Sequence, residues 1–375
     1  MESSPMNRLP QDALHQIFLS LPIRQIIICK AVCKSLYSTL SSPSFLHFIS
    51  SSPSHIFPLI ALRPSHRSHS HSPHLALHLF DPLSNRWLRF SLNFLPFPSL
   101  LPITSSHGLL YLWASSPNLP NSGPINNKTL IVCNPLTRQF KALPQLGSAW
   151  SRHGSVLIGA GPSQVLVLTE LATLYSTNNS WLKFSSDLPS KPRSPVLIDN
   201  FILALCDVGS PWRSQWKLFK SLVIDREDQL AQKWTRLEKD EWGDVFDIIK
   251  RPRLFMGGKN KILMIGGLKS SYSLHSACST ILILRLDLES LEWDEAGRMP
   301  PQMYQFFQDS RKFKVFGGGN RVCFSVKRLG RLVLWECFEE NGCEKNEWRW
   351  IDVVTGNGDG LCRGFLLEAQ LSAVP

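Results

Sequence analysis

The histidines of this sequence are grouped in a way that could bind a metal ion. Five of them fall between residues 66 and 78, in a stretch that includes Ser65-His66-Arg67-Ser68-His69. Imidazole is a common metal ligand, but a metal site needs fixed geometry and supporting hydrogen bonds, which a serine-rich loop without periodicity does not supply. We therefore predict no metal site and no cofactor.

The nine cysteines are the second group. Their number is odd and no two are spaced as Cys-x-x-Cys, so the sequence favours reduced thiols over a disulfide framework or a zinc ribbon. The N-terminus has no basic start followed by an apolar stretch, and no apolar run reaches the ~18 to 20 residues that span a bilayer. We expect a protein of the nucleus, the cytoplasm or both, without a membrane span.

Motifs of common catalytic centres are missing from the sequence. It contains no G-x-S-x-G, H-E-x-x-H, P-loop or G-x-G-x-x-G pattern. His107, His153 and His275 are scattered, and the acidic clusters at 238–241 and 339–340 are typical of solvated loops, not of a paired acid and base. We predict no catalytic residue and a chain that is not an enzyme.

The positive charge is regional. The net charge is +11, and residues 61–169 hold eight basic side chains against a single acid, Asp81. A basic surface suits an acidic or phosphorylated protein partner, although a merely solvated basic face is the alternative. Arg138, Lys141 and Arg152 are the candidate substrate contacts. No RRM, KH or zinc-finger pattern accompanies the charge, so we do not expect nucleic acid to be the main partner.

Residues 1–49 form the first predicted domain, with three short helices. Leu14, Ile17, Phe18 and Leu21 recur at the spacing of one helical face, and Pro22 ends that helix. Three consecutive isoleucines at 26–28 exceed what one narrow face of so small a unit can bury. The excess of apolar surface points to a partner.

The rest of the chain predicts an all-β region. Residues 50–73 form a Ser/His-rich linker that includes a possible first propeller strand, and residues 74–375 form the second domain. Apolar runs of strand length recur along it and alternate with turn residues, for example at 57–62, 155–158, 196–205 and 321–326.

One pattern repeats through this region: an apolar strand, an Asp or Asn turn, and an aromatic residue six positions later. It occurs in three clear copies and three looser ones, whose aromatic residues are Trp87, Phe140, Trp181, Trp234, Trp293 and Trp348. A period of ~50 residues with several strands per unit is typical of a kelch-type β-propeller, and six markers predict six blades. We expect the aromatic residues to wedge between blades.

Glycines and the two ends of the β region complete the propeller prediction. The clusters at 266–267 and 317–319 match the glycine pairs of a kelch blade. Segments 59–62 and 361–371 are candidates for a shared closing blade, because an open ring would expose strand edges.

The first 48 residues resemble an F-box, through Leu9-Pro10-x-Asp12-x-Leu14, the run 17–22, Val32-Cys33-Lys34 and Ser42-Pro43-x-Phe45. The pattern departs at Leu36, where that family usually has Trp. Together with Cys133–Arg138 and Arg298–Tyr304, it makes nearly the whole chain similar to plant F-box/kelch-repeat proteins.

The resemblance implies a substrate receptor of an SCF-type ubiquitin ligase, which marks its target for degradation. The F-box would bind a Skp-family adaptor, and through it a cullin, while the propeller holds an unknown protein substrate. The adaptor contacts that carry over to this sequence are Leu9, Pro10, Ile17, Leu21, Pro22, Val32 and Cys33.

Three alternatives stay open. Ile17 and Val32 could be internal to the helical unit instead of facing an adaptor. The protein could bind the adaptor without a ligase role. A kelch propeller also resembles galactose oxidase, a copper enzyme whose site needs paired His with Tyr and Cys. This chain has five tyrosines, and one of them, Tyr37, lies inside the F-box.

Overall fold

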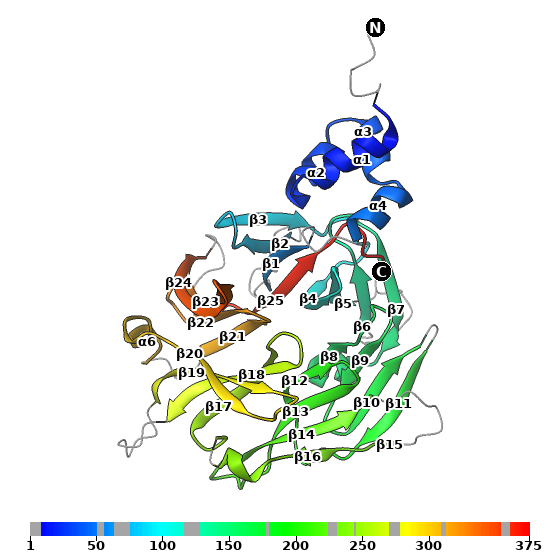
Figure 1. Ribbon diagram of the computed structural model, residues 1–375. Helices are drawn as coiled ribbons and strands as arrows, with labels where there is room; N and C mark the ends of the chain where they lie inside the picture. The colour runs from blue at the N-terminus through cyan, green and yellow to red at the C-terminus, as the bar shows by residue number, and fades with distance from the viewer. Residues whose placement is uncertain are drawn as a thin grey trace.

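The chain folds as a small helical domain beside a six-bladed β-propeller (Figure 1). The computed structural model describes residues 9–50, 56–63, 76–115, 128–177, 180–223, 231–243, 245–269, 278–308, 313–353 and 361–375. Residues 64–75, which hold four of the five clustered histidines, lie outside the described residues. The predicted mainly β class and the predicted number of blades are confirmed.

The N-terminal domain contains four helices where the sequence predicted three: α1 (Gln11–Leu19), α2 (Ile23–Lys30), α3 (Lys34–Leu40) and α4 (Pro43–Ser50). The chain leaves the helical conformation between α2 and α3, because Cys33 is extended at φ −156° and ψ 164°. Its sulfur accepts a hydrogen bond from the Leu36 amide, at 3.5 Å, and so caps α3.

Six four-stranded units surround a central channel. Their strands, from the channel outwards, are β25 (Gly364–Ala369), β1 (Phe57–Leu62), β2 (Ala76–Asp81) and β3 (Arg86–Ser91) in blade 1; β4 (Leu100–Ser106), β5 (Leu109–Ser115), β6 (Lys128–Cys133) and β7 (Phe140–Leu146) in blade 2; and β8 (Ser155–Ile158), β9 (Val165–Leu168), β10 (Ala172–Ser176) and β11 (Trp181–Ser186) in blade 3. The short β15 (Ala231–Gln232) adds a parallel fifth strand to blade 3.

The remaining blades follow the same order. They are β12 (Arg193–Ile198), β13 (Phe201–Asp207), β14 (Trp216–Leu222) and β16 (Thr235–Leu237) in blade 4; β17 (Ile249–Met256), β18 (Lys261–Lys269), β19 (Cys278–Asp287) and β20 (Trp293–Arg298) in blade 5; and β21 (Phe313–Gly318), β22 (Arg321–Val326), β23 (Arg331–Glu340) and β24 (Cys343–Asp352) in blade 6. Short helices α5 (Ser148–His153) and α6 (Pro301–Gln308) lie in loops between blades.

The ring closes through the two ends of the propeller sequence. Strand β1 pairs antiparallel with the C-terminal strand β25, from Phe57 opposite Ala369 to Leu62 opposite Gly364. The predicted closing blade is therefore present, and it brings the C-terminus near the helical domain (Figure 1). No helix in the described ranges is long and apolar enough to cross a bilayer.

The side chain of the repeated Asp/Asn residue stabilises its turn, as the sequence predicted. In blade 1 the Asp81 carboxylate accepts from the Leu83 amide at 3.0 Å, and in blade 5 the Asp287 carboxylate accepts from the Glu289 amide at 2.9 Å. The residue four positions after each acid has a positive φ, 53° at Asn85 and 57° at Leu291. A side-chain acceptor and one left-handed residue together reverse the chain between the two outer strands.

The aromatic markers lie on, or directly before, the outermost strand of each blade, and tryptophan tethers neighbouring blades. Trp87 Nε1 donates to the Asp352 carbonyl of blade 6 at 2.7 Å, and Trp181 Nε1 donates to the Pro144 carbonyl of blade 2 at 2.9 Å. Trp234 Nε1 donates to Ser186 Oγ of blade 3, also at 2.9 Å. The predicted wedge between blades is confirmed at these three positions.

Two details of the sequence prediction were wrong. Gly317–Gly319 and Gly266–Gly267 occupy different places in their blades. Gly317–Gly319 have positive φ values at the end of β21 and in the turn to β22, whereas Gly266–Gly267 lie inside β18. The apolar run 196–205 is not one strand but a hairpin of β12 and β13, because Asp199 at φ 48° opens a tight turn that hydrophobic periodicity does not reveal.

Substitutions at Asn134 can test whether its turn requires an amide side chain instead of a carboxylate. Its side-chain oxygen accepts from the Leu136 amide, while its nitrogen donates to the carbonyls of Gln370 and Ala373, at 2.9 and 2.8 Å. Asn134→Asp removes both donors and faces two carbonyls with a carboxylate, so we expect the free energy of unfolding in urea to fall by about 3 kcal/mol. Asp81→Asn, at the same turn position of blade 1, should cost under about 1 kcal/mol. Equal losses would contradict the assignment.

Candidate functional site

The helical domain exposes apolar side chains at positions that the F-box resemblance predicts to contact an adaptor. The exposed fractions are 42% for Leu9, 48% for Ile17 and 69% for Val32. Both residues that could have been internal, Ile17 and Val32, are therefore on the surface. Isolated exposed apolar residues are ordinary, but several on one 40-residue domain are typical of a docking surface.

Two prolines set where the exposed helices begin. Pro10 precedes α1 with φ −55° and ψ 148°, and Pro22 precedes α2 with φ −59° and ψ 146°. The Pro22 carbonyl accepts from the Gln25 and Ile26 amides, at 2.8 and 3.2 Å. Pro10, Pro22 and Cys33 are exposed, whereas Leu21 is half-buried. Six of the seven predicted adaptor contacts thus reach solvent, and Leu21 does so in part.

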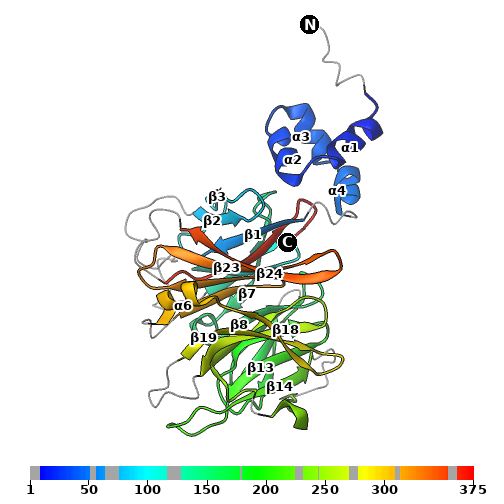
Figure 2. The ribbon, with the colours of Figure 1, turned by 60° about the vertical axis from the view of Figure 1, so that its left-hand side comes forward.

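The other side of the helical domain packs against the propeller. Phe18, Ile26 and Phe45 are buried, and they belong to one continuous apolar cluster with residues of blades 1 and 2 such as Leu95 and Leu100. Figures 1 and 2 place the four helices outside the ring, with α4 nearest to it. The apolar excess predicted from the sequence is therefore divided: the propeller covers one part, and the other stays exposed.

Sequence reasoning missed two residues of the exposed surface. Ile28 is 57% exposed and Tyr37 is 59% exposed, and the Lys30 ammonium lies 5.4 Å from the centre of the Tyr37 ring. The signal for Ile28 was present, since Ile26, Ile27 and Ile28 cannot all face inwards in one helix. Which of the three is exposed depends on how α2 packs: Ile26 is buried and Ile27 is half-buried.

The predicted substrate contacts do not form a single surface. Arg138 lies in the turn between β6 and β7, and Lys141 lies at the start of β7. Arg152 is in α5, which follows the other end of β7, and that strand is roughly 20 Å long. The structure therefore brings Arg138 and Lys141 together and places Arg152 at the opposite end of blade 2.

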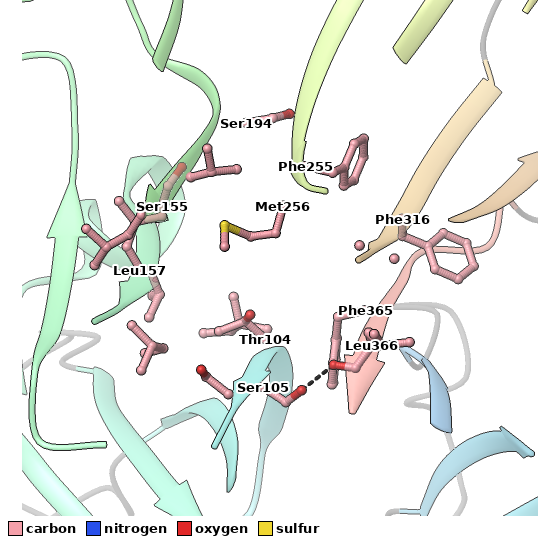
Figure 3. Close-up of a pocket in the computed structure, with 18 of the residues that line it drawn as sticks. Thr104, Ser105, Ser155, Leu157, Ser194, Phe255, Met256, Phe316, Phe365 and Leu366 are labelled. Atoms are coloured by element: carbon pink, nitrogen blue, oxygen red, sulfur yellow. Dashed lines mark hydrogen bonds between the residues drawn. The ribbon is translucent and has the colours of Figure 1, made fainter. Parts of the chain in front are cut away.

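The propeller channel encloses a cavity of about 880 Å³. Its wall comes from the innermost strand of every blade. Figure 3 shows Thr104, Ser155, Ser194, Met256 and Phe365 around the same open space. Small hydroxyl side chains come from blades 2 to 4 and aromatic rings from blades 5, 6 and 1, so the interior can accept polar and apolar groups on different sides.

The innermost strands run in the same direction, so the channel has two different mouths. At the strand-end mouth, a ring nitrogen of His107 lies 2.8 Å from the Gly159 carbonyl, and the Gly319 amide donates to the Met256 carbonyl at 2.7 Å. Asp199 and Glu368 are the acids among the lining residues, and both lie towards this mouth.

The strand-start mouth carries the cations of the cavity lining: Arg63, Arg253, Lys314 and Arg363. Burial, with repulsion from Arg363, lowers the pKa of Arg63 to about 10. Burial, with repulsion from Arg193, Arg251 and Arg363, lowers the pKa of Arg253 to about 10. Both groups remain charged at pH 7, so this mouth is positive while the other is not.

Metal ligands do not gather in the described part of the chain, where no group of three or more His, Cys, Asp or Glu could hold an ion. Tyr111 is buried and its hydroxyl donates to the Pro162 carbonyl, at 3.3 Å. His107 contacts a backbone carbonyl. The described residues thus contain no cluster of the type that a copper oxidase would need.

Comparisons with known proteins agree with this architecture. The F-box domain family matches residues 6–48. The chain is 58% identical over 389 residues to SKP1-interacting partner 15 of Arabidopsis thaliana, covering 100% of both chains. It is 28% identical over 405 residues to Protein ABERRANT PANICLE ORGANIZATION 1 of Oryza sativa subsp. japonica, covering 98% of this chain and 89% of that one. An F-box/kelch-repeat protein of Arabidopsis thaliana is 26% identical over 318 residues, covering 80% and 72%.

The helical domain and the propeller together define the class of F-box propeller proteins. Given 58% identity over the full length of both chains, the protein belongs to the plant F-box protein family. The kelch character of the repeat is supported by the name of one relative.

A substitution at Ser194 can test whether the backbone is strained at the channel. It has φ 47°, where a side chain is disfavoured, and it follows the first residue of β12. We expect Ser194→Gly to raise the free energy of unfolding by about 0.5 to 1 kcal/mol in urea denaturation. Ser155→Gly, at the first residue of the regular strand β8, should lower it by about 0.5 to 1 kcal/mol. The same sign for both would rule out the strain.

Proposed function

We propose that this protein is the substrate-recognition subunit of an SCF-type ubiquitin ligase. Its F-box binds a Skp-family adaptor, the adaptor connects it to a cullin, and the propeller holds a protein to be ubiquitinated. The observation that carries the proposal is the apolar surface of α1 to α3, which stays exposed after the helical domain has packed against the propeller. The relative named SKP1-interacting partner 15 supports the identity of the adaptor.

The adaptor surface consists of Leu9, Pro10, Ile17, Leu21, Pro22, Val32 and Cys33, extended by Ile28 and Tyr37. Burial of apolar area provides most of the stabilisation in such an interface, at about 25 cal/mol per Å². A few central side chains usually carry most of the affinity, and Ile17, Ile28 and Val32 are candidates because they are large and open.

The chain itself is a non-catalytic subunit in this proposal. Its buried thiols are poor nucleophiles: burial raises the pKa of Cys133 to about 12 and that of Cys206 to about 11. The proposed role needs two docking surfaces held at a fixed separation, and the apolar cluster shared by helices and propeller provides that connection.

Charge placed on the adaptor surface should abolish docking. We expect Ile17→Asp and Val32→Asp each to weaken binding of the purified Skp adaptor at least about tenfold, which corresponds to ~1.4 kcal/mol, in a titration with the full chain. Both sites are exposed, so the melting temperature should stay within a few degrees of wild type.

Leu83→Asp is the matched control, since Leu83 is 77% exposed but lies on the propeller. It should bind the adaptor as wild type does. Unchanged affinity in both Ile17→Asp and Val32→Asp would disprove the assigned surface. Adaptor binding by the wild type without recruitment of the cullin would favour an adaptor-binding protein that has no ligase role.

Cysteine alkylation gives an independent footprint. Cys33 and Cys343 are the exposed thiols among nine free cysteines, and only Cys33 lies on the proposed surface. We expect excess adaptor to slow iodoacetamide labelling of Cys33 at least about fivefold at pH 8, because docking covers the sulfur. Labelling of Cys343 should not change, and slowing of both or of neither would argue against docking at this face. Mass spectrometry of the labelled peptides provides the measurement.

A further inference from the structure

The strand-start mouth of the channel concentrates arginines from widely separated parts of the sequence. Arg63 follows β1, Arg193 begins β12, Arg253 lies in β17 and Arg363 precedes β25. They come from blades 1, 4 and 5, and Lys314 of β21 adds a cation from blade 6. Burial lowers the pKa of Arg63 and of Arg253, and repulsion from neighbouring arginines of this group lowers both further.

Within the ranges that the structure describes, carbonyl groups and aromatic rings, not carboxylates, contact Arg63 and Arg253. Arg63 donates to the Ile103 carbonyl and its guanidinium lies 5.9 Å from the centre of the Phe365 ring. Arg253 donates to the Phe313 carbonyl at 3.4 Å. Among the described residues, Arg63, Arg253 and Arg363 form no salt bridge.

One arginine also has an unused hydrogen-bond donor. Arg63 Nε is buried and has no hydrogen-bond partner within the described part of the protein. Asp207 is the acid that acts on the cluster, and it does so at Arg193. Oriented guanidinium groups with free donors match the oxygen atoms of a phosphate, which accept two parallel hydrogen bonds from one arginine.

The backbone around the mouth is distorted in two blades. The pairing of β12 with β13 shifts between Arg193 and Val196, and the pairing of β17 with β18 shifts between Lys250 and Arg253. Each bulge contains a residue with positive φ, Ser194 at 47° and Arg251 at 55°. Bulges redirect side chains, and left-handed residues other than glycine are concentrated at functional sites.

Two exposed apolar side chains lie on the same side of the propeller as these cations. Trp212 is 95% exposed in the loop from β13 to β14, and Leu171 is 77% exposed in the loop from β9 to β10. Both loops lie on the strand-start side, because β9 and β13 run antiparallel to the innermost strands β8 and β12. Tryptophan and arginine are both enriched among the residues that dominate binding at interfaces.

We propose that the strand-start mouth binds a phosphorylated segment of the substrate protein. The phosphate lies among Arg63, Arg253 and Arg363, and an apolar side chain of the same segment packs on Trp212 or Leu171. The recessed position of Arg63 and Arg253 in the cavity lining favours a narrow peptide over a flat membrane surface. This inference rests on the proposed function, because it assumes that the propeller holds a substrate.

The test uses the full chain bound to its adaptor and a degenerate peptide library with a central phosphothreonine. The matched library carries threonine instead. We expect the phosphorylated library to be retained at least tenfold better at physiological salt. Arg253→Gln and Arg363→Gln should each reduce that retention at least tenfold, and Trp212→Ala should reduce it about threefold. Competition with inorganic phosphate at high concentration should release the peptides.

Arg138→Gln combined with Lys141→Gln is the matched control, because it removes two cations from the strand-end side of the propeller, opposite the proposed site. It should retain the phosphorylated library as wild type does. Arg363 is exposed, so Arg363→Gln reports on the site even where Arg253→Gln unfolds the protein. Melting temperature and adaptor binding of each variant separate loss of the site from loss of the fold.

Three results would overturn the proposal. The first is equal retention of both libraries, and the second is loss of retention only in the Arg138 and Lys141 variant. The third is arginine-dependent binding to vesicles of phosphatidylcholine and phosphatidylserine at 4:1, or to a single-stranded oligonucleotide, without retention of phosphopeptides. Peptide capture by the chain alone, with no adaptor binding, would leave the site intact while the ligase proposal fails.

Discussion

The pairing of β1 with β25 is the contact on which the rest of the molecule depends. Without it, blade 1 would lose its innermost strand and the neighbouring blades would face an open gap, with unpaired backbone groups along two edges. Asn134 reinforces the closure, since its side chain holds the tail that follows β25. Closure also places the C-terminus and the helical domain on the same side of the ring (Figure 1).

A closed ring explains how two functions share one chain. The tethers from Trp87, Trp181 and Trp234 connect blades 1, 3 and 4 each to the blade before it, which helps to fix the innermost strands around the channel. The helical domain is held to blades 1 and 2 by a continuous apolar cluster. A protein bound at the channel and an adaptor bound at the helices would therefore keep a defined separation, which transfer of ubiquitin between two proteins requires.

The sequence predicted those features that depend on neighbouring residues. The Asp/Asn turn followed six residues later by an aromatic residue is local, so its spacing revealed the blades and their number. The F-box pattern is local as well. Exposure of Ile17 and Val32 could not be decided from spacing alone, because it depends on which face of the helices the propeller covers.

Features assembled from distant segments left no pattern in the sequence. Arg63, Arg253 and Arg363 are separated by 190 and 110 residues along the chain, yet they line one mouth. The regional charge instead suggested Arg138, Lys141 and Arg152, which the structure places at two ends of blade 2. The bulges at Ser194 and Arg251 were equally hidden, since neither position has the glycine that usually marks a left-handed residue.

Hydrogen exchange of the full chain, alone and with the purified Skp adaptor, tests the central claim most directly. The account predicts added protection in α1 to α3, between residues 11 and 40, and no change in the six blades. Protection in the propeller with none in these helices would contradict it, because the adaptor would then be bound at a different surface.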